Sequence, residues 1–135
     1  MSGGKALAPA LLLIAAVAAA SHAPKIWKSD SRGVLLGIAR APEKARLRQN
    51  PHAGDTNAVL AGAKLYREHC AECHGADGRG SGRAANLRSA DVQRATAGEL
   101  EWLVRNGNLA RDMPSWSGLP EQRRWQIVSY LKTLH

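Results

Sequence analysis

The chain has 135 residues, enough for one small domain with extensions but not for a second independent core. It carries 19 Lys and Arg against 11 Asp and Glu, a formal net charge of +8, and it lacks Phe. The excess charge is uneven, because residues 21–54 hold seven basic and two acidic side chains while residues 55–135 hold eleven and nine. A nearly neutral folded part beside a basic segment argues against nucleic-acid binding.

Residues 1–20 read MSGGKALAPALLLIAAVAAA, in which Lys5 is followed by an uncharged run. The run ends in the A-x-A pattern Ala18-Ala19-Ala20, so the segment is predicted to be a secretory signal peptide. The alternative is an uncleaved anchor, although the run is shorter than the roughly 20 residues that span a bilayer and contains Pro9. Both readings predict a periplasmic or exported protein in an oxidising compartment. The uncleaved anchor would in addition associate the protein with the membrane.

Residues 21–54 are predicted to form a basic, partly ordered arm or linker. Pro, Gly and charged residues are scattered through them without a sustained period. Trp27 and the stretch from Val34 to Ile38 are expected to dock on the domain or on a partner. The positive charge favours a membrane surface or a protein complex as the docking partner, and a solvated linker is the alternative.

From Asp55 onward apolar residues repeat with helical spacing, and residues 55–135 are predicted to form one all-α domain of three main helices. The first helix is expected to begin at a Thr56 or Asp55 cap. One face of this helix comprises Val59, Gly62, Ala63, Tyr66 and Cys70. The helix therefore delivers Cys70 to the core side of the domain.

The other two helices have clear signals where they begin. The second follows a capping-box pattern from Thr96 to Glu99 and is stopped by Gly107. The third is expected to begin near Pro120, a residue favoured in the first helical turn. Their apolar faces are Leu100, Leu103 and Val104 in the second helix, and Ile127, Tyr130, Leu131 and Leu134 in the third.

The two cysteines, Cys70 and Cys73, stand in HCAECHG and are followed at once by His74. A zinc site needs four ligands, usually from two such pairs, and the chain has no second pair. A redox dithiol needs a βαβ unit, and a structural disulfide leaves His74 without a role. C-x-x-C-H is the attachment signature of c-type haem, which uses both thiols for covalent attachment and the imidazole for the iron.

Met113 is the only methionine expected in the mature chain. Pro114 restricts it toward extended backbone, which favours a thioether held out from the loop toward a metal. We expect His74 and Met113 to be the two axial ligands of the haem iron, and a methionine that fills a core gap is the alternative. With both axial positions taken by protein, the haem exchanges electrons and is closed to substrates, which predicts an electron carrier and not an enzyme.

The segments GAKLYREHCAECHG, DMPSW and WQIVSYLKTL make residues 55–135 resemble the small bacterial class I cytochromes c. The resemblance implies the small cytochrome c fold around one covalent haem c. Cys70 and Cys73 would attach the haem, with His74 as proximal and Met113 as distal ligand.

The resemblance also implies packing and hydrogen bonding. Gly62 and Tyr66 of the first helix would pack on Ile127 and Tyr130 of the last. In the family, a proline carbonyl in the loop after the haem motif accepts a hydrogen bond from the proximal imidazole, and in this chain Arg83 stands in that place. Arg83 or Arg79 is expected either to pair with a haem propionate or to be solvated.

The remaining aromatic and imidazole side chains have simpler interpretations. Trp102 and Trp116 are expected at the edge of the haem pocket, with core packing as the alternative. His69 is expected to face away from the site. His22, His52 and His135 lie in the arm or at the terminus and are not expected to bind iron.

The leading hypothesis is an exported monohaem carrier that moves one electron at a time between redox partner proteins. One alternative is a haem subunit of a membrane or periplasmic oxidoreductase complex. Another is a haem enzyme or ligand sensor with an open sixth position, and the last is a haem-free disulfide protein.

Overall fold

The structure is a computed structural model that describes residue 1, residues 31–82 and residues 84–135. Its elements are α1 Ser31–Ala39, α2 Glu43–Arg46, α3 Thr56–His69, α4 Ala71–His74, α5 Ala90–Arg94, α6 Ala97–Asn106, the 3₁₀ turn η1 Leu109–Arg111 and α7 Glu121–Leu131. Within these residues the only β-pairing is an isolated bridge between Asn108 and Met113. The all-α prediction is therefore confirmed.

Several expectations concern residues outside the described ranges. The predicted signal peptide lies there except for its first residue, and so do His22, Trp27 and Arg83. None of the helices in the described ranges is long and apolar enough to span a bilayer.

The three predicted main helices are present, with the expected ends. Asp55 caps α3, and its side chain accepts a hydrogen bond from the Asn57 amide (2.8 Å). Thr96 and Glu99 form a complete capping box at the start of α6. Gly107 ends α6 with a φ of 69°, a conformation that favours glycine. Pro120 occupies the N-cap position of α7.

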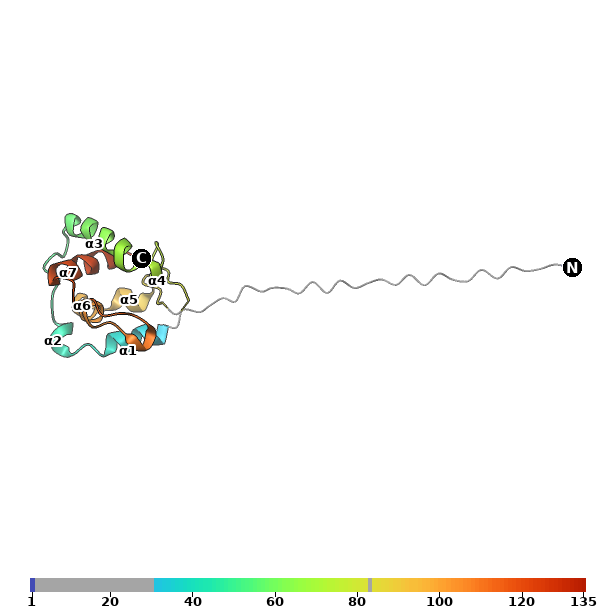
Figure 1. The fold of residues 1–135 in the computed structure, drawn as a ribbon. Coiled ribbons are helices and arrows are strands. Elements are labelled where there is room, and N and C mark those ends of the chain that lie inside the picture. Colours follow the sequence, from blue (N-terminus) through green and yellow to red (C-terminus); the bar gives the residue numbers. More distant parts are fainter. Residues whose placement is uncertain (2–30, 83) are drawn as a thin grey trace.

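Helices α3 and α7 run side by side along one edge of the molecule (Figure 1). A Cβ atom at Gly62 would lie 1.9 Å from the Gln126 carbonyl oxygen, so only glycine allows the helices to approach this closely. The Tyr66 and Tyr130 rings pack with centroids 5.1 Å apart, and Ile127 is buried in the same cluster as Tyr66. The packing expected of Gly62 and Tyr66 on the last helix is confirmed.

The core has two apolar clusters with a cavity between them. One cluster joins α1, α5, α6 and α7, and the other joins α3, the loop after α4 and α7. Both clusters supply walls of the same cavity, which is lined by Val92, Leu100 and Leu103 from the first and by Leu87, Ile127 and Leu131 from the second.

Residues 31–54 fold against the domain, which differs from the expected arm. Figure 1 places α1 and α2 along the edge opposite α3 and α7. Ile38, Ala41 and Ala45 are buried. Arg46 donates to the Ala41 carbonyl (2.9 Å), and its own carbonyl accepts from Thr96 Oγ1 (3.1 Å). The stretch from Val34 to Ile38 packs on the domain, as expected, and it does so as part of helix α1.

An ion-pair network around the buried carboxylate of Glu101 joins the segment after α2 to the helical core. Glu101 on α6 is 2% exposed, and one of its carboxylate oxygens accepts from Arg124 Nε of α7 (2.7 Å). The other oxygen accepts from Arg48 Nη1 (3.2 Å), whose guanidinium lies over the Trp125 ring at 5.0 Å. Arg48 also pairs with Glu121 at the surface. The network therefore links α6, α7 and the chain before α3.

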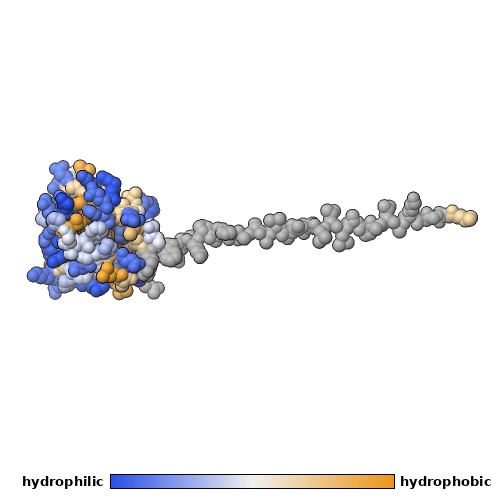
Figure 2. Space-filling model, in the orientation of Figure 1, coloured by the Kyte–Doolittle hydropathy of each residue, from blue (hydrophilic) through white to orange (hydrophobic). Residues whose placement is uncertain are grey.

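The surface of the helical part is predominantly polar in the view of Figure 2, with small apolar areas. The exposed large apolar side chains of residues 31–135, as far as they are described, are Leu35, Leu36, Leu47, Leu60 and Leu109.

Candidate functional site: a cavity with two thiols, an imidazole and a thioether

The cysteine motif forms a single tight turn at the end of α3. Cys70 ends α3, with its amide donating to the Tyr66 carbonyl (2.8 Å), and α4 begins at the next residue. The amides of Cys73 and His74 both donate to the Cys70 carbonyl (3.2 and 2.9 Å). Both thiols are free, and burial raises the pKa of Cys70 to about 11. The turn brings two thiols and one imidazole to one wall of the cavity.

The His74 ring is held by one hydrogen bond. Its Nδ1 lies 2.9 Å from the Ala85 carbonyl oxygen. A carbonyl only accepts, so Nδ1 carries the proton and Nε2 keeps its lone pair for a metal. Burial lowers the pKa of His74, while the bond to Ala85 opposes the shift, and the lower pKa favours the neutral ring that a metal requires.

The acceptor of this bond corrects the expectation drawn from the family pattern. The carbonyl is that of Ala85, two residues beyond Arg83. The loop before Ala85 is shaped by hydrogen bonds to backbone carbonyls, from the Gly80 amide to the His74 carbonyl (2.8 Å) and from Ser81 Oγ to the Cys73 carbonyl (2.8 Å). These contacts depend on loop backbone conformation, which has no periodic sequence signal.

Met113 is fixed by a short backbone bridge. Its amide donates to the Asn108 carbonyl (3.1 Å), and its carbonyl accepts from the Asn108 amide (2.8 Å). A Cβ at Gly107 would lie 2.7 Å from the Met113 carbonyl oxygen, so glycine is needed where α6 ends and the loop folds back. Met113 is partly buried and packs on the cluster that contains Leu103. Its side chain also lines the cavity.

The cavity has a volume of about 580 Å³, within the range of small-molecule and cofactor sites. Its lining includes all four predicted site residues: Cys70, Cys73, His74 and Met113. Its walls are mainly apolar, as a porphyrin ring requires. Size, wall chemistry and donor set together fit a covalently attached haem.

Two aromatic expectations have different outcomes. Trp116 lines the cavity, and its amide donates to the Val104 carbonyl (3.1 Å). Trp102 packs on the first apolar cluster instead, which is the alternative interpretation. His69 also lines the cavity, contrary to expectation, and its ring lies 5.0 Å from that of Trp116. His69 is the last residue of α3, directly before the turn that carries the cysteine motif.

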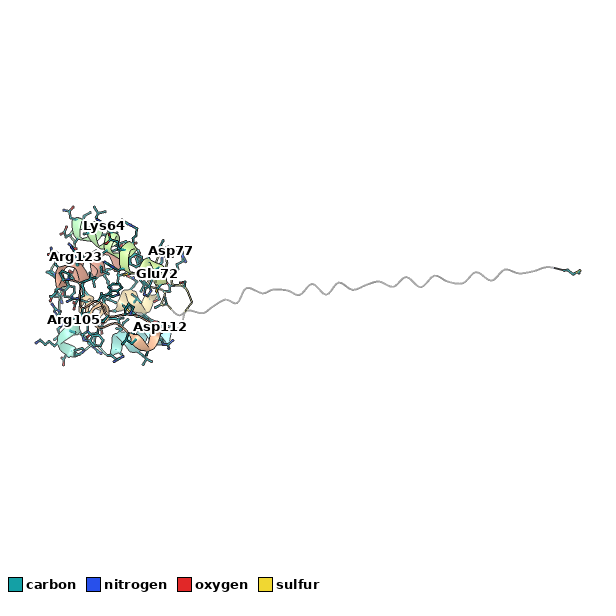
Figure 3. The ribbon with its side chains drawn as sticks, in the orientation of Figure 1. Lys64, Glu72, Asp77, Arg105, Asp112 and Arg123 are labelled. Carbon is teal, nitrogen blue, oxygen red and sulfur yellow. The ribbon has the colours of Figure 1, made fainter. Side chains whose placement is uncertain are left out.

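The charged side chains around the site are arranged as follows. Arg79 is exposed and pairs with Asp77 (3.0 Å), so it has the solvated position that was one of its two expectations. The backbone amide and guanidinium of Arg79 lower the pKa of Asp77. Glu72 and Asp112 line the cavity together with Arg111. Figure 3 shows Glu72, Asp77 and Asp112 on the side of α4, away from Lys64, Arg105 and Arg123.

Sequence reasoning missed the contribution of α1 to the cavity. Gly33, Val34 and Ile38 line it. The signal that could have identified them is the helical spacing of Val34, Ile38 and Ala41, once Gly33 and Gly37 are read as part of the same face. Within the described ranges, no three His, Cys, Asp or Glu side chains are grouped so that they could hold a metal ion.

Comparison with known proteins matches the chain to a family and to a curated relative. The model of the family described as "Cytochrome C oxidase, cbb3-type, subunit III" matches residues 57–131. Cytochrome c550 of Pseudomonas aeruginosa is 34% identical over 95 residues, which cover 64% of this chain and 63% of that protein. The match therefore spans less than two thirds of this relative. The family match includes all four predicted site residues but neither α1 nor α2.

Proposed function

The chain belongs to the cytochrome c family, and from this premise we propose that it is an exported one-electron carrier whose haem is ligated by His74 and Met113. Membership of this family implies a covalently bound haem c and electron transfer as the general activity. The observation that carries the finer proposal is that two thiols, one imidazole with a free Nε2 and one thioether line a single apolar cavity.

The bound haem would supply reversible exchange of one electron at iron. Cys70 and Cys73 would hold it covalently on the turn between α3 and α4. The Ala85 carbonyl would fix the imidazole orientation and increase the basicity of Nε2. The apolar walls would exclude water and, with the thioether of Met113, favour the less charged reduced state.

A second candidate is a haem subunit of an oxidoreductase complex. The family description, which names an oxidase subunit, favours this reading. It differs from the free carrier in whether the protein purifies alone. A third candidate, a haem enzyme or sensor, requires that Met113 leave the sixth position open.

Redox partner proteins are part of the proposal in either case. Encounters of electron carriers are weak and guided by charge. Docking to a membrane surface or complex is assigned to the basic residues 21–54, among which Arg40 and Lys44 are exposed on the part of the segment that folds on the domain.

The test is the optical spectrum of the exported protein, reduced and oxidised, with pyridine haemochrome analysis and CO addition. A c-type spectrum, a weak near-infrared methionine-to-iron band in the oxidised protein and no response to CO would support the carrier. Haem that binds CO readily would favour an enzyme or sensor. Absence of haem after expression with a c-type maturation system would overturn the proposal.

A further inference from the structure

Helix α1 has one face of small and apolar residues and one exposed face. Gly33, Val34, Gly37 and Ile38 lie on the inner face at i, i+1, i+4 and i+5, and all four are buried or partly buried. Leu36 on the outer face is 65% exposed. This helix lies outside the family match at residues 57–131, so it is an addition to the matched domain.

The glycines let α1 approach the chain around Met113 closely. A Cβ at Gly37 would lie 3.1 Å from Asn108 Nδ2 and 3.2 Å from Leu103 Cδ1. A Cβ at Gly33 would lie 2.7 Å from the guanidinium carbon of Arg111. Both contacts are made with α6 or with the loop between α6 and Met113.

Asn108 connects α1 to Met113. Its backbone forms both hydrogen bonds of the bridge to Met113. Its side-chain amide donates to the Gly33 carbonyl (3.5 Å) and touches the position of a Gly37 Cβ. Val34 and Met113 also pack on the same apolar cluster, which contains Ile38 and Leu103. The loop that carries Met113 is therefore held between α6 and α1.

We propose that α1 is a positioning element for Met113, which holds the Asn108–Met113 bridge against α6 and so favours the methionine-ligated state of the haem. The inference rests on the proposed function, because it requires Met113 to be the sixth ligand. External CO binds only the state in which Met113 has left the iron, so its apparent affinity reports the population of that state. Loosening α1 raises this population.

The primary test is Gly37→Val in the full-length holoprotein. Gly37 itself does not line the cavity, so valine at this position reaches the site only through Asn108 and Leu103, which do line it. Valine is a better helix former than glycine, so α1 is not weakened by propensity. Leu36→Val on the exposed face is the matched control.

We expect Gly37→Val to weaken the methionine-to-iron band in the oxidised protein and to increase the apparent CO affinity of the reduced protein about tenfold. Haem stoichiometry and far-ultraviolet circular dichroism should stay at the parent level. Leu36→Val should match the parent in both spectra and CO binding. A Gly37→Val protein with the parent's band and CO affinity would overturn the inference.

A second variant covers the case in which Gly37→Val does not fold. Ile38→Ala removes packing between α1 and the cluster that contacts Met113, at a residue that also lines the cavity, and Ile38→Val, which keeps most of that wall, is the conservative rescue. The expected effect of Ile38→Ala is again about tenfold in CO affinity, largely restored in Ile38→Val. If Ile38→Ala lowers only the unfolding midpoint, α1 is purely structural and the inference fails.

The parent protein separates failure of this inference from failure of the proposed function. A parent that lacks the methionine-to-iron band would overturn the proposed ligation as well. If the parent has the band and the variants keep the parent's band and CO affinity, only this inference is overturned.

Discussion

The proposed ligation of the haem by Met113 is what distinguishes the carrier from the enzyme candidate. Met113→Ala should retain covalent haem, because Cys70 and Cys73 are unchanged, but should gain CO binding in the ferrous state, because alanine offers no sixth ligand. CO difference spectra of parent and variant measure this directly. A variant that binds CO no better than the parent would show that Met113 is not the ligand.

Cys73 is the exposed member of the thiol pair. Cys73→Ser should lose most of the covalently bound haem when the protein is made with a c-type maturation system, because serine cannot form the second thioether. Pyridine haemochrome analysis of the denatured protein gives the stoichiometry. Unchanged stoichiometry would count against attachment through two thioethers.

Glu101 is the least exposed carboxylate among the described residues, and it compensates the buried guanidinium of Arg124. Glu101→Gln should lower the free energy of unfolding by about 3 kcal/mol, because removal of one partner leaves a buried charge unpaired. Urea unfolding of the holoprotein measures the loss. Glu99→Gln is the control, because it removes the charge of a pair with the half-exposed Arg46 while glutamine can keep the capping bond to the Thr96 amide, and it should cost no more than about 1 kcal/mol. Equal losses in the two variants would contradict the assignment.

Glu121 gives a pH-dependent expectation. Hydrogen bonds from Trp125 and Arg48 lower its pKa in the folded protein. A carboxyl with a lowered folded pKa contributes stability above its unfolded pKa, near 4.5, and loses that contribution as pH falls through the folded value. Glu121→Gln should therefore reduce the dependence of stability on pH below about 4.5 and leave the slope above it unchanged. Parallel curves of unfolding midpoint against pH for parent and variant would refute this.

At the scale of elements, the α3–α7 contact depends on Gly62. The Gly62→Ala methyl group would meet the Gln126 backbone, which cannot move as a flexible side chain can. Overpacking costs about 1–3 kcal/mol, and a larger cost is expected against backbone, so the gain of about 1 kcal/mol in helix propensity is outweighed. The variant should have a lower urea midpoint, while Gly118→Ala, which meets open space, should stay near the parent. A parent-like midpoint for Gly62→Ala would show that the two helices can separate without loss.

The elements that could be predicted from sequence are those with a cap and a long apolar repeat. Asp55 and the Thr96–Glu99 box marked the starts of α3 and α6, and Pro120 marked that of α7. Helix α1 escaped prediction because Gly33 and Gly37 occupy inner positions where a periodicity search expects large apolar residues. Their small size serves the close approach to α6, which is a tertiary requirement that the local sequence does not express.

The candidate site shows the same division. The C-x-x-C-H spacing and the position of Met113 before Pro114 predicted the chemical groups of the site, and all four side chains line one cavity. The Ala85 carbonyl and the inward turn of His69 could not be predicted, because both depend on loop conformation and not on residue type. Helix α5, with five residues, is too short to show a period.

For the whole molecule, the formal charge of +8 is a poor guide to what a redox partner meets. The cavity lining includes Glu68, Glu72 and Asp112 with Arg111, and Figure 3 shows Glu72 and Asp112 on a different side from Lys64 and Arg123. Because charges are screened within about 10 Å at ordinary ionic strength, the side chains around the cavity matter more than the distant basic ones.

The position of α1 also fixes where the chain enters the domain. Ser31 begins α1, and Gly33, two residues later, already lines the cavity. Anything that holds the preceding residues, whether a membrane or another subunit, therefore holds the molecule by the edge of its redox centre. The domain would then rotate about that edge. The effective concentration of the haem site near a partner on the same membrane or complex would rise, without any increase in the affinity of the docking contact.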